Sequence, residues 1–238
     1  MKALLNHPTL LIKRRWLIAS TAGLVTVLAW DASGFDIALA HFFGGTENFP
    51  FRHSYALAAV LHSGARNLSW VVFIVLTAGA IFPFGFFRSL TSRERIQFPT
   101  TILLCVAAIG LIKLISRTSC PWELQIFGGV QPYVSHWNFG QFDGGGGHCF
   151  PAGHASAGFA FMGGYFALQR RRPRLANFWL SVAFVTGVIL GVSQQFRGAH
   201  FASHTLWTAW ICWTVAGLID TLYHSSLWNK AIQTGTHA

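Results

Sequence analysis

Three short clusters of basic residues and histidines lie beside apolar runs in this 238-residue chain. Imidazole groups can act as nucleophiles or proton donors, and fixed cations can hold the oxygens of a phosphate group. Together the clusters indicate phosphoryl transfer, in which catalysis depends on positioning and electrostatic stabilisation. The clusters are Lys113 with Arg117, His154, and Arg197 with His200 and His204.

Spacing within two of the clusters is four residues. If the surrounding segment is helical, Lys113 and Arg117 share one helix face, and so do His200 and His204. A plainer interpretation of the two cations is that their long side chains reach lipid headgroups. His154 follows Pro151 and Gly153 at the start of an apolar run, which predicts a place in the first turn of a helix. The free N–H groups there favour an anion, although a capping role is the alternative.

The composition predicts that these clusters stand at the ends of membrane-spanning helices. The chain is 53% hydrophobic and only 10% charged, whereas soluble domains average about 25% charged residues. Helices are expected because unpaired backbone groups are costly in lipid. We therefore predict an all-α, six-transmembrane-helix bundle forming a single domain over residues 1–238. The six apolar runs are approximately 16–33, 67–87, 98–116, 154–170, 176–194 and 203–223.

The basic residues collect between the apolar runs rather than forming a patch suited to nucleic acid. With both termini inside, 12 of the 17 basic residues are cytoplasmic, as the positive-inside rule requires, and the three clusters face outward. The first run resembles a signal peptide, but Trp30 and Asp31 follow Ala29, where a cleavage site would be sought, so an uncleaved helix is expected. The cytoplasmic set is Lys2, Lys13, Arg14, Arg15, Arg88, Arg93, Arg95, Arg170, Arg171, Arg172, Arg174 and Lys230.

Two outer segments carry further predictions. Residues 34–54 are moderately apolar, which favours a short interfacial helix between helices 1 and 2 over a plain loop. Residues 117–153 form a long, glycine-rich outer loop between helices 3 and 4, of a length usually found in functional loops. Cys120 and Cys149 both lie in it and could pair in an oxidising compartment; the alternative is two free thiols.

These residues resemble the signature of the integral-membrane members of the type 2 phosphatidic acid phosphatase superfamily. That signature is Lys-x6-Arg-Pro, then Pro-Ser-Gly-His, then Ser-Arg-x5-His-x3-Asp. The resemblance covers the chain from about residue 98 to its end. The matching segments are Lys113 to Pro121, Pro151-Ala-Gly-His154, and Ser193 through His200 to His204.

Four positions depart from that signature. Cys120 and Gln194 replace its two arginines, Ala152 replaces its serine, and His204 replaces its aspartate. Each missing arginine has a neighbour three residues away that could reach the same phosphate: Arg117 before Cys120, and Arg197 after Gln194.

The resemblance implies a role for each site residue. His200 would be the nucleophile and form a phosphohistidine, while His154 would protonate the leaving group. His204 would orient His200, with Asp143 or Glu123 supplying the carboxylate that position 204 lacks. No metal or other cofactor is expected. The phosphate-binding set would be Lys113, Arg117, Arg197, Ser156, Gly153 and Gln194.

The predicted function is therefore a membrane lipid phosphatase of a bacterial inner membrane, with its site in the periplasm and a lipid phosphate as its partner. Candidate substrates are lipid A 1-phosphate, undecaprenyl pyrophosphate, phosphatidylglycerophosphate and phosphatidic acid. Three alternatives stay open: an intramembrane serine protease using Ser156, a zinc site, and a catalytically weak or inactive protein that binds lipid phosphates. The zinc ligands would be His148, His154, His200 and His204.

Overall fold

The structure, a computed structural model, describes residues 8–225, and this part of the chain is helical with no strand. Lys2 and Lys230 of the predicted cytoplasmic set lie outside the described residues. The α-helices are α2 (Pro8–Ser33), α3 (Phe35–Gly44), α4 (Ala65–Ile81), α5 (Ser92–Ile115), α6 (Ser156–Phe159), α7 (Gly163–Leu168), α8 (Pro173–Phe196) and α9 (Ala202–Tyr223). Shorter helical turns are η1 (Ala56–Gly64), η2 (Gly85–Ser89), η3 (Pro121–Glu123), η4 (Gln125–Phe127), η5 (Gly153–Ala155) and η6 (Ala160–Met162).

Within the described residues, four helical stretches are long and apolar enough to cross a membrane. Large apolar side chains on them, such as Ile74, Leu111 and Val185, point away from the protein. A lipid environment accepts such side chains, and each helix satisfies its own backbone hydrogen bonds. The chain therefore has the character of an integral membrane protein. The four stretches are Leu10–Ser33, Ala56–Ser89, Ser92–Ile115 and Pro173–Phe196.

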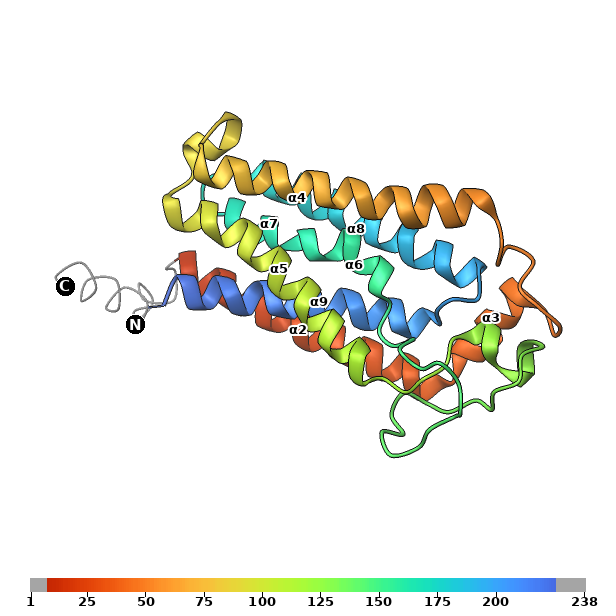
Figure 1. The fold of residues 1–238 in the computed structure, drawn as a ribbon. Helices are drawn as coiled ribbons and strands as arrows, with labels where there is room; N and C mark the ends of the chain where they lie inside the picture. The colour runs from red at the N-terminus through yellow and green to blue at the C-terminus, as the bar shows by residue number, and fades with distance from the viewer. Residues whose placement is uncertain (1–7, 226–238) are drawn as a thin grey trace.

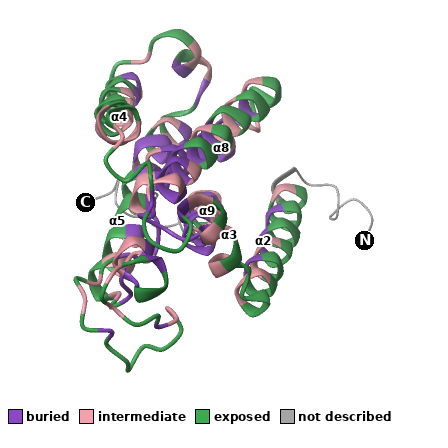
Figure 2. Cartoon of the chain, turned by 90° about the vertical axis from the view of Figure 1, so that its right-hand side faces the viewer, coloured by how far each residue is buried: buried purple, intermediate pink, exposed green. Residues whose placement is uncertain are grey.

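The other two predicted spans differ from a plain membrane helix. Residues 153–168 form a succession of short pieces, η5, α6, η6 and α7, and residues 202–223 form α9. Both lie in the interior of the bundle, where most buried residues gather (Figure 2). The six-span count stays a prediction, because these two segments are not among the four stretches of membrane-spanning character.

Two predicted boundaries shift in the structure. The predicted second span, 67–87, begins earlier: the π-helical turn η1 starts at Ala56 and continues directly into α4. Between α2 and α4 the chain forms the short helix α3, which covers only the first half of the predicted segment 34–54. Gly34, with a φ of 66°, separates α2 from α3 and allows the change of direction.

The two ends of the bundle differ in character (Figure 1). At one end lie the start of α2, the end of α9 and the basic turns between α4 and α5 and between α7 and α8. There Arg170 forms two hydrogen bonds with Asp220, and Arg171 pairs with Glu94. At the other end lie α3 and the long segment between α5 and η5 (Figure 1).

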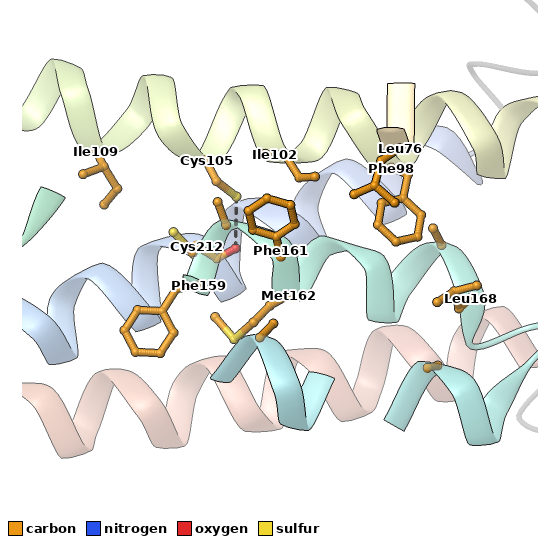
Figure 3. Packing of buried hydrophobic residues seen from close by; sticks show 14 of the residues in the cluster. Leu76, Phe98, Ile102, Cys105, Ile109, Phe159, Phe161, Met162, Leu168 and Cys212 are labelled. Atoms are coloured by element: carbon orange, nitrogen blue, oxygen red, sulfur yellow. Dashed lines mark hydrogen bonds between the residues drawn. The ribbon is translucent and has the colours of Figure 1, made fainter. Parts of the chain in front are cut away.

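The core holds the site-bearing helices together. Phe98, Ile102 and Cys105 of α5 face Phe161 and Cys212, and the Cys105 thiol donates to the Cys212 carbonyl at 3.4 Å (Figure 3).

Glycines allow a close contact between two helices of the core. A Cβ atom added to Gly158 of α6 would lie 2.3 Å from the backbone nitrogen of Gly187 in α8. The Ser69 hydroxyl of α4 also donates to the Ala157 carbonyl at 2.9 Å. The short segment that follows His154 is therefore fixed on two sides.

Candidate active site

The predicted site residues lie at the end of the bundle that carries the long α5–η5 segment (Figure 1). Lys113 is in the last turn of α5, His154 is in the turn η5, and His204 is in the first turn of α9. His200 lies between α8 and α9. Residues that are far apart in sequence are therefore brought to one place.

His200 and His204 form the centre of the site. Their Nδ1 atoms are 3.5 Å apart, and the residues are 4% and 1% exposed. The sequence predicted one shared helix face, but α9 begins at Ala202, so His200 precedes the helix. The two rings still meet because Phe201 is extended and turns the chain into the helix. For a hydrogen bond between the two nitrogens, one must carry a proton and the other a lone pair.

His154 and Lys113 also lie near His200. The ring centroids of His154 and His200 are 6.1 Å apart. The Lys113 side chain passes Gly153, where a Cβ atom would lie 3.6 Å from the lysine Cδ. Two imidazoles and a lysine side chain thus lie close to one another.

Burial lowers the pKa of His200 well below its usual value of 6.5, and electrostatic interactions with the neighbouring His204, Lys113 and His154 side chains lower it further. At neutral pH the His200 imidazole is therefore uncharged and retains a lone pair. A neutral imidazole is the form that a nucleophile requires.

Cys120 and Cys149 are joined in a disulfide. Cys149 Sγ lies 3.6 Å from His200 Nδ1, so the disulfide stands against the central histidine. Ligand atoms of Cys149, His200 and His204 lie within 4.8 Å of one another. A disulfide sulfur is not the thiolate that zinc binds, so this group does not offer a three-ligand zinc site.

His148, another of the predicted zinc ligands, is held by a backbone contact. His148 Nδ1 is hydrogen-bonded to the Lys113 carbonyl at 2.9 Å, which holds the long segment against the end of α5.

The two substitute arginines have different surroundings. Arg197 donates to the Gln194 side chain at 3.1 Å and to the Arg52 carbonyl at 3.2 Å, and its guanidinium lies 5.8 Å from the Trp122 ring centre. Arg197 therefore stands beside the position where the family has arginine. Arg117 does not share a helix face with Lys113, because α5 ends at Ile115 and the backbone is extended from Ser116. Its side chain is exposed.

Neither predicted carboxylate reaches the histidines. Asp143 accepts hydrogen bonds from the Ser119 backbone and hydroxyl and from Gly145 N–H. Glu123 accepts from the Cys120 N–H at 2.7 Å. Both carboxylates are used to fold the long segment around the disulfide, and neither forms a hydrogen bond with His200 or His204.

A histidine and a carboxylate from other parts of the chain, His136 and Asp31, lie beside His204. The ring of His136 lies perpendicular to that of His204 at 5.9 Å between centroids, and His136 Nε2 is 3.3 Å from Asp31 Oδ2. Sequence reasoning missed both residues. The signal that could have found them is Asp31 itself, an ionisable residue at the end of the first apolar run.

Ser156 is turned toward its own backbone. Its hydroxyl donates to the Gly153 carbonyl at 2.6 Å, which stabilises the start of α6. A serine protease would need this hydroxyl against a histidine base, and the hydroxyl proton is committed to the carbonyl instead.

A cavity of about 330 Å³ begins at the polar residues of the site. Lys113, Gly153, His154 and Ser156 line it together with Arg66. The rest of its lining is mainly apolar and comes from η1, α4, α5 and the α6–η6 segment, with exposed residues such as Trp70 and Leu103 among them. The cavity thus joins a cationic region to an apolar surface of the helices.

Comparison with models of protein families identifies one family for this chain. The family model of the PAP2 superfamily matches residues 96–228, more than half of the chain, and the protein belongs to this superfamily. Its members are generally phosphatases that act on phosphate esters. No curated protein and no solved structure matches the chain.

Proposed function

We propose that this protein is a membrane lipid phosphatase that hydrolyses a phosphomonoester or pyrophosphate of a lipid through a phosphohistidine on His200. The observation that carries the proposal is the cavity that joins Lys113 and His154 to an apolar lining. A phosphate headgroup fits its cationic end, and hydrocarbon fits the remainder. A water-soluble phosphate would gain nothing from the apolar part.

The histidine contacts support Nε2 of His200 as the attacking atom. His200 Nδ1 faces His204 and the disulfide, so Nε2 is the nitrogen left for phosphorus. As the N–P bond forms, the P–O bond to the lipid breaks, and His154 gives a proton to the leaving oxygen. Water then attacks the phosphohistidine, His154 takes up a proton, and inorganic phosphate leaves.

Cations stabilise the charge of the transferring phosphoryl group. In the proposal, Lys113, whose side chain passes Gly153, and Arg197, which is hydrogen-bonded to Gln194 at the end of α8, hold the phosphate oxygens. Such fixed charges need no reorganisation during the reaction. Arg66, which lines the cavity, is a further cation available to the headgroup. The mechanism assigns no step to a metal.

We further propose six membrane spans, with α7 completing the fourth and α9 forming the sixth. The basic turns at the end opposite the histidines support a cytoplasmic location for that end. The site would then face the periplasm of a bacterial inner membrane, where the disulfide is also favoured.

The test is phosphate release by the purified full-length protein in lipid–detergent micelles. The panel is lipid A 1-phosphate, undecaprenyl pyrophosphate, phosphatidylglycerophosphate and phosphatidic acid, with glycerol phosphate as the soluble control. We expect release from at least one lipid and none from the control. His200→Ala should lower the rate by roughly 10³-fold or more, by comparison with other covalent catalytic sets.

A second readout separates turnover from binding. With a ³²P-labelled substrate, acid-labile label should appear on the wild-type protein and be absent from His200→Ala. Binding of every lipid phosphate without release or labelling would overturn the proposal and favour the inactive lipid-phosphate-binding protein. The replacements at Cys120, Gln194 and His204 are the features that would then explain the loss of turnover.

A further inference from the structure

Asp31, at the end of α2, presents a carboxylate to the site from the first helix of the described chain. Its Oδ2 accepts from three ring N–H groups: His136 Nε2 at 3.3 Å, Trp137 Nε1 at 3.0 Å and Trp207 Nε1 at 2.8 Å. The side chain is 7% exposed. A charge that is nearly withdrawn from water acts strongly on its neighbours, because little solvent screens it.

His136 connects this carboxylate to His204. Its ring stacks on Phe150 at 4.3 Å between centroids with 5° between the planes. Both stacked rings are perpendicular to His204, at 5.9 Å for His136 and 5.3 Å for Phe150. Phe150 is covalently next to Cys149 of the disulfide. The stack therefore fixes the orientation of His136 relative to the catalytic histidines.

We infer that Asp31 and His136 are positioning residues for the His200–His204 pair, and that Asp31 supplies the negative charge that the family places at residue 204. The inference rests on the proposed function, because the charge is needed when His200 carries a phosphoryl group. The order of groups is Asp31, His136, His204 and His200, with 3.3 Å between the first pair and 3.5 Å between the last.

The chemistry of the phosphohistidine explains why a carboxylate is needed. Attack through Nε2 leaves the His200 ring cationic while its Nδ1–H still donates to His204. A neutral His204 accepts that hydrogen bond but brings no negative charge. Asp31, held behind His136, lowers the energy of the cation from a greater distance. In the family signature the aspartate would do so directly.

The resting protein already has the protonation that this requires. Burial lowers the pKa of His136, against the opposing effect of Asp31, so the ring is neutral at pH 7. Its Nε2–H then donates to Asp31 and keeps the carboxylate paired. These two histidines face each other, and the other titratable groups that face them are Asp31 and Asp36 toward His136, and His200 and Lys113 toward His204.

The neighbouring carboxylate Asp36 has a different task. It accepts hydrogen bonds from the Ser203 backbone N–H at 3.0 Å, from the Ser203 hydroxyl and from Trp30 Nε1. These contacts tie the first turn of α9 to α3. Asp36 therefore holds the helix that carries His204, whereas Asp31 is directed at the imidazoles through His136.

The experiment uses full-length Asp31→Asn and His136→Gln, with Asp143→Asn as the matched control. Asp143 is also a buried carboxylate at this end of the bundle, but its partners are Ser119 and Gly145. The substrate is the lipid that the phosphate-release panel identifies. With it, we expect kcat to fall roughly tenfold to a hundredfold in the first two variants, and KM to change by less than about threefold. The direct partner of a catalytic histidine costs more, about 10⁴-fold. Asp143→Asn should keep the wild-type kcat.

The pH profile separates an electrostatic role from a structural one. Removing the Asp31 charge makes protonation of the histidines harder, so the acid limb of kcat/KM should move to lower pH in Asp31→Asn. If the substitution only disturbed the structure, kcat/KM would fall by the same factor at every pH and the acid limb would stay at the same pH. An unchanged kcat, or a scaled profile with an unmoved limb, would overturn the inference.

Orthovanadate tests the same charge without turnover, because it adopts the five-coordinate geometry of phosphoryl transfer when it binds a nucleophile. Its Kd, measured by calorimetry, should rise about tenfold in Asp31→Asn and stay unchanged in Asp143→Asn. If the wild type releases no phosphate but shows this difference, the proposed function fails and the positioning role stands. Equal vanadate affinity in all variants would overturn the positioning role whatever the turnover.

Discussion

Replacing Gly158 with alanine tests whether the close contact between α6 and α8 positions the active site. The added Cβ would lie 2.3 Å from Gly187 N and 2.6 Å from Gly187 Cα. Carbon atoms in good contact are about 3.5–4.0 Å apart, so α6 must move away from α8 by more than an ångström. The obstructing atoms are backbone atoms, which no side-chain rotation can clear.

The expected magnitude follows from that overlap. Overpacking of this kind costs about 1–3 kcal/mol, and each kcal/mol lowers Tm by about 2–4 °C in a protein of this size. We therefore expect a Tm about 2–12 °C below wild type. Because α6 begins two residues after His154, the proposed general acid should shift with it. A misplacement of about 1 Å can cost roughly 10²-fold in rate.

Gly110→Ala is the matched control. Gly110 lies in α5, one of the membrane-length helices, and a Cβ there has no atom within 4 Å. Alanine in an open helical position should be neutral or stabilise by about 0.5–1 kcal/mol. The assays are thermal unfolding in detergent micelles, followed by circular dichroism, and phosphate release. The reasoning is refuted if Gly158→Ala matches Gly110→Ala in both Tm and kcat.

Two further predictions concern the buried ion pair and the nucleophile. Asp220→Ala leaves Arg170 without the carboxylate that accepts its two hydrogen bonds at 2.7 and 2.8 Å, so we expect a loss of about 3–5 kcal/mol in thermal unfolding. Phosphate release below the melting transition should be retained, because the pair lies at the opposite end of the bundle; a large loss of kcat with an unchanged Tm would contradict this. Because the pKa of His200 is lowered, this proposed nucleophile stays neutral at pH 6.5, and activity should be lost only as pH falls through the lowered pKa. The acid limb of kcat/KM should thus lie below pH 6.5. A limb at or above pH 6.5 would contradict this if substrates with different phosphate pKa values all show it, because such a shared limb belongs to the enzyme.

Local chemistry was sufficient to identify the family and the candidate residues. Lys113, His154 and His200 could be selected because cations and imidazoles at fixed spacing point to phosphoryl transfer, and a chain so poor in charge must present apolar helices to lipid. The pairing of Cys120 with Cys149 was left open from sequence, and the structure joins them. These features depend on residue type and on separations of a few positions, which a sequence displays directly.

Helix ends and long-range partners were decided only by the tertiary structure. The prediction that Lys113 and Arg117 share a helix face was wrong, because α5 ends at Ile115. Periodicity in an apolar run does not mark such a boundary. The carboxylate near the histidines was sought in the long loop at Asp143, whereas the structure brings Asp31 from α2. His136 and Asp31 are 105 residues apart in sequence. Only the packing of α2 against α9, with the long segment folded over their ends, brings that pair to His204.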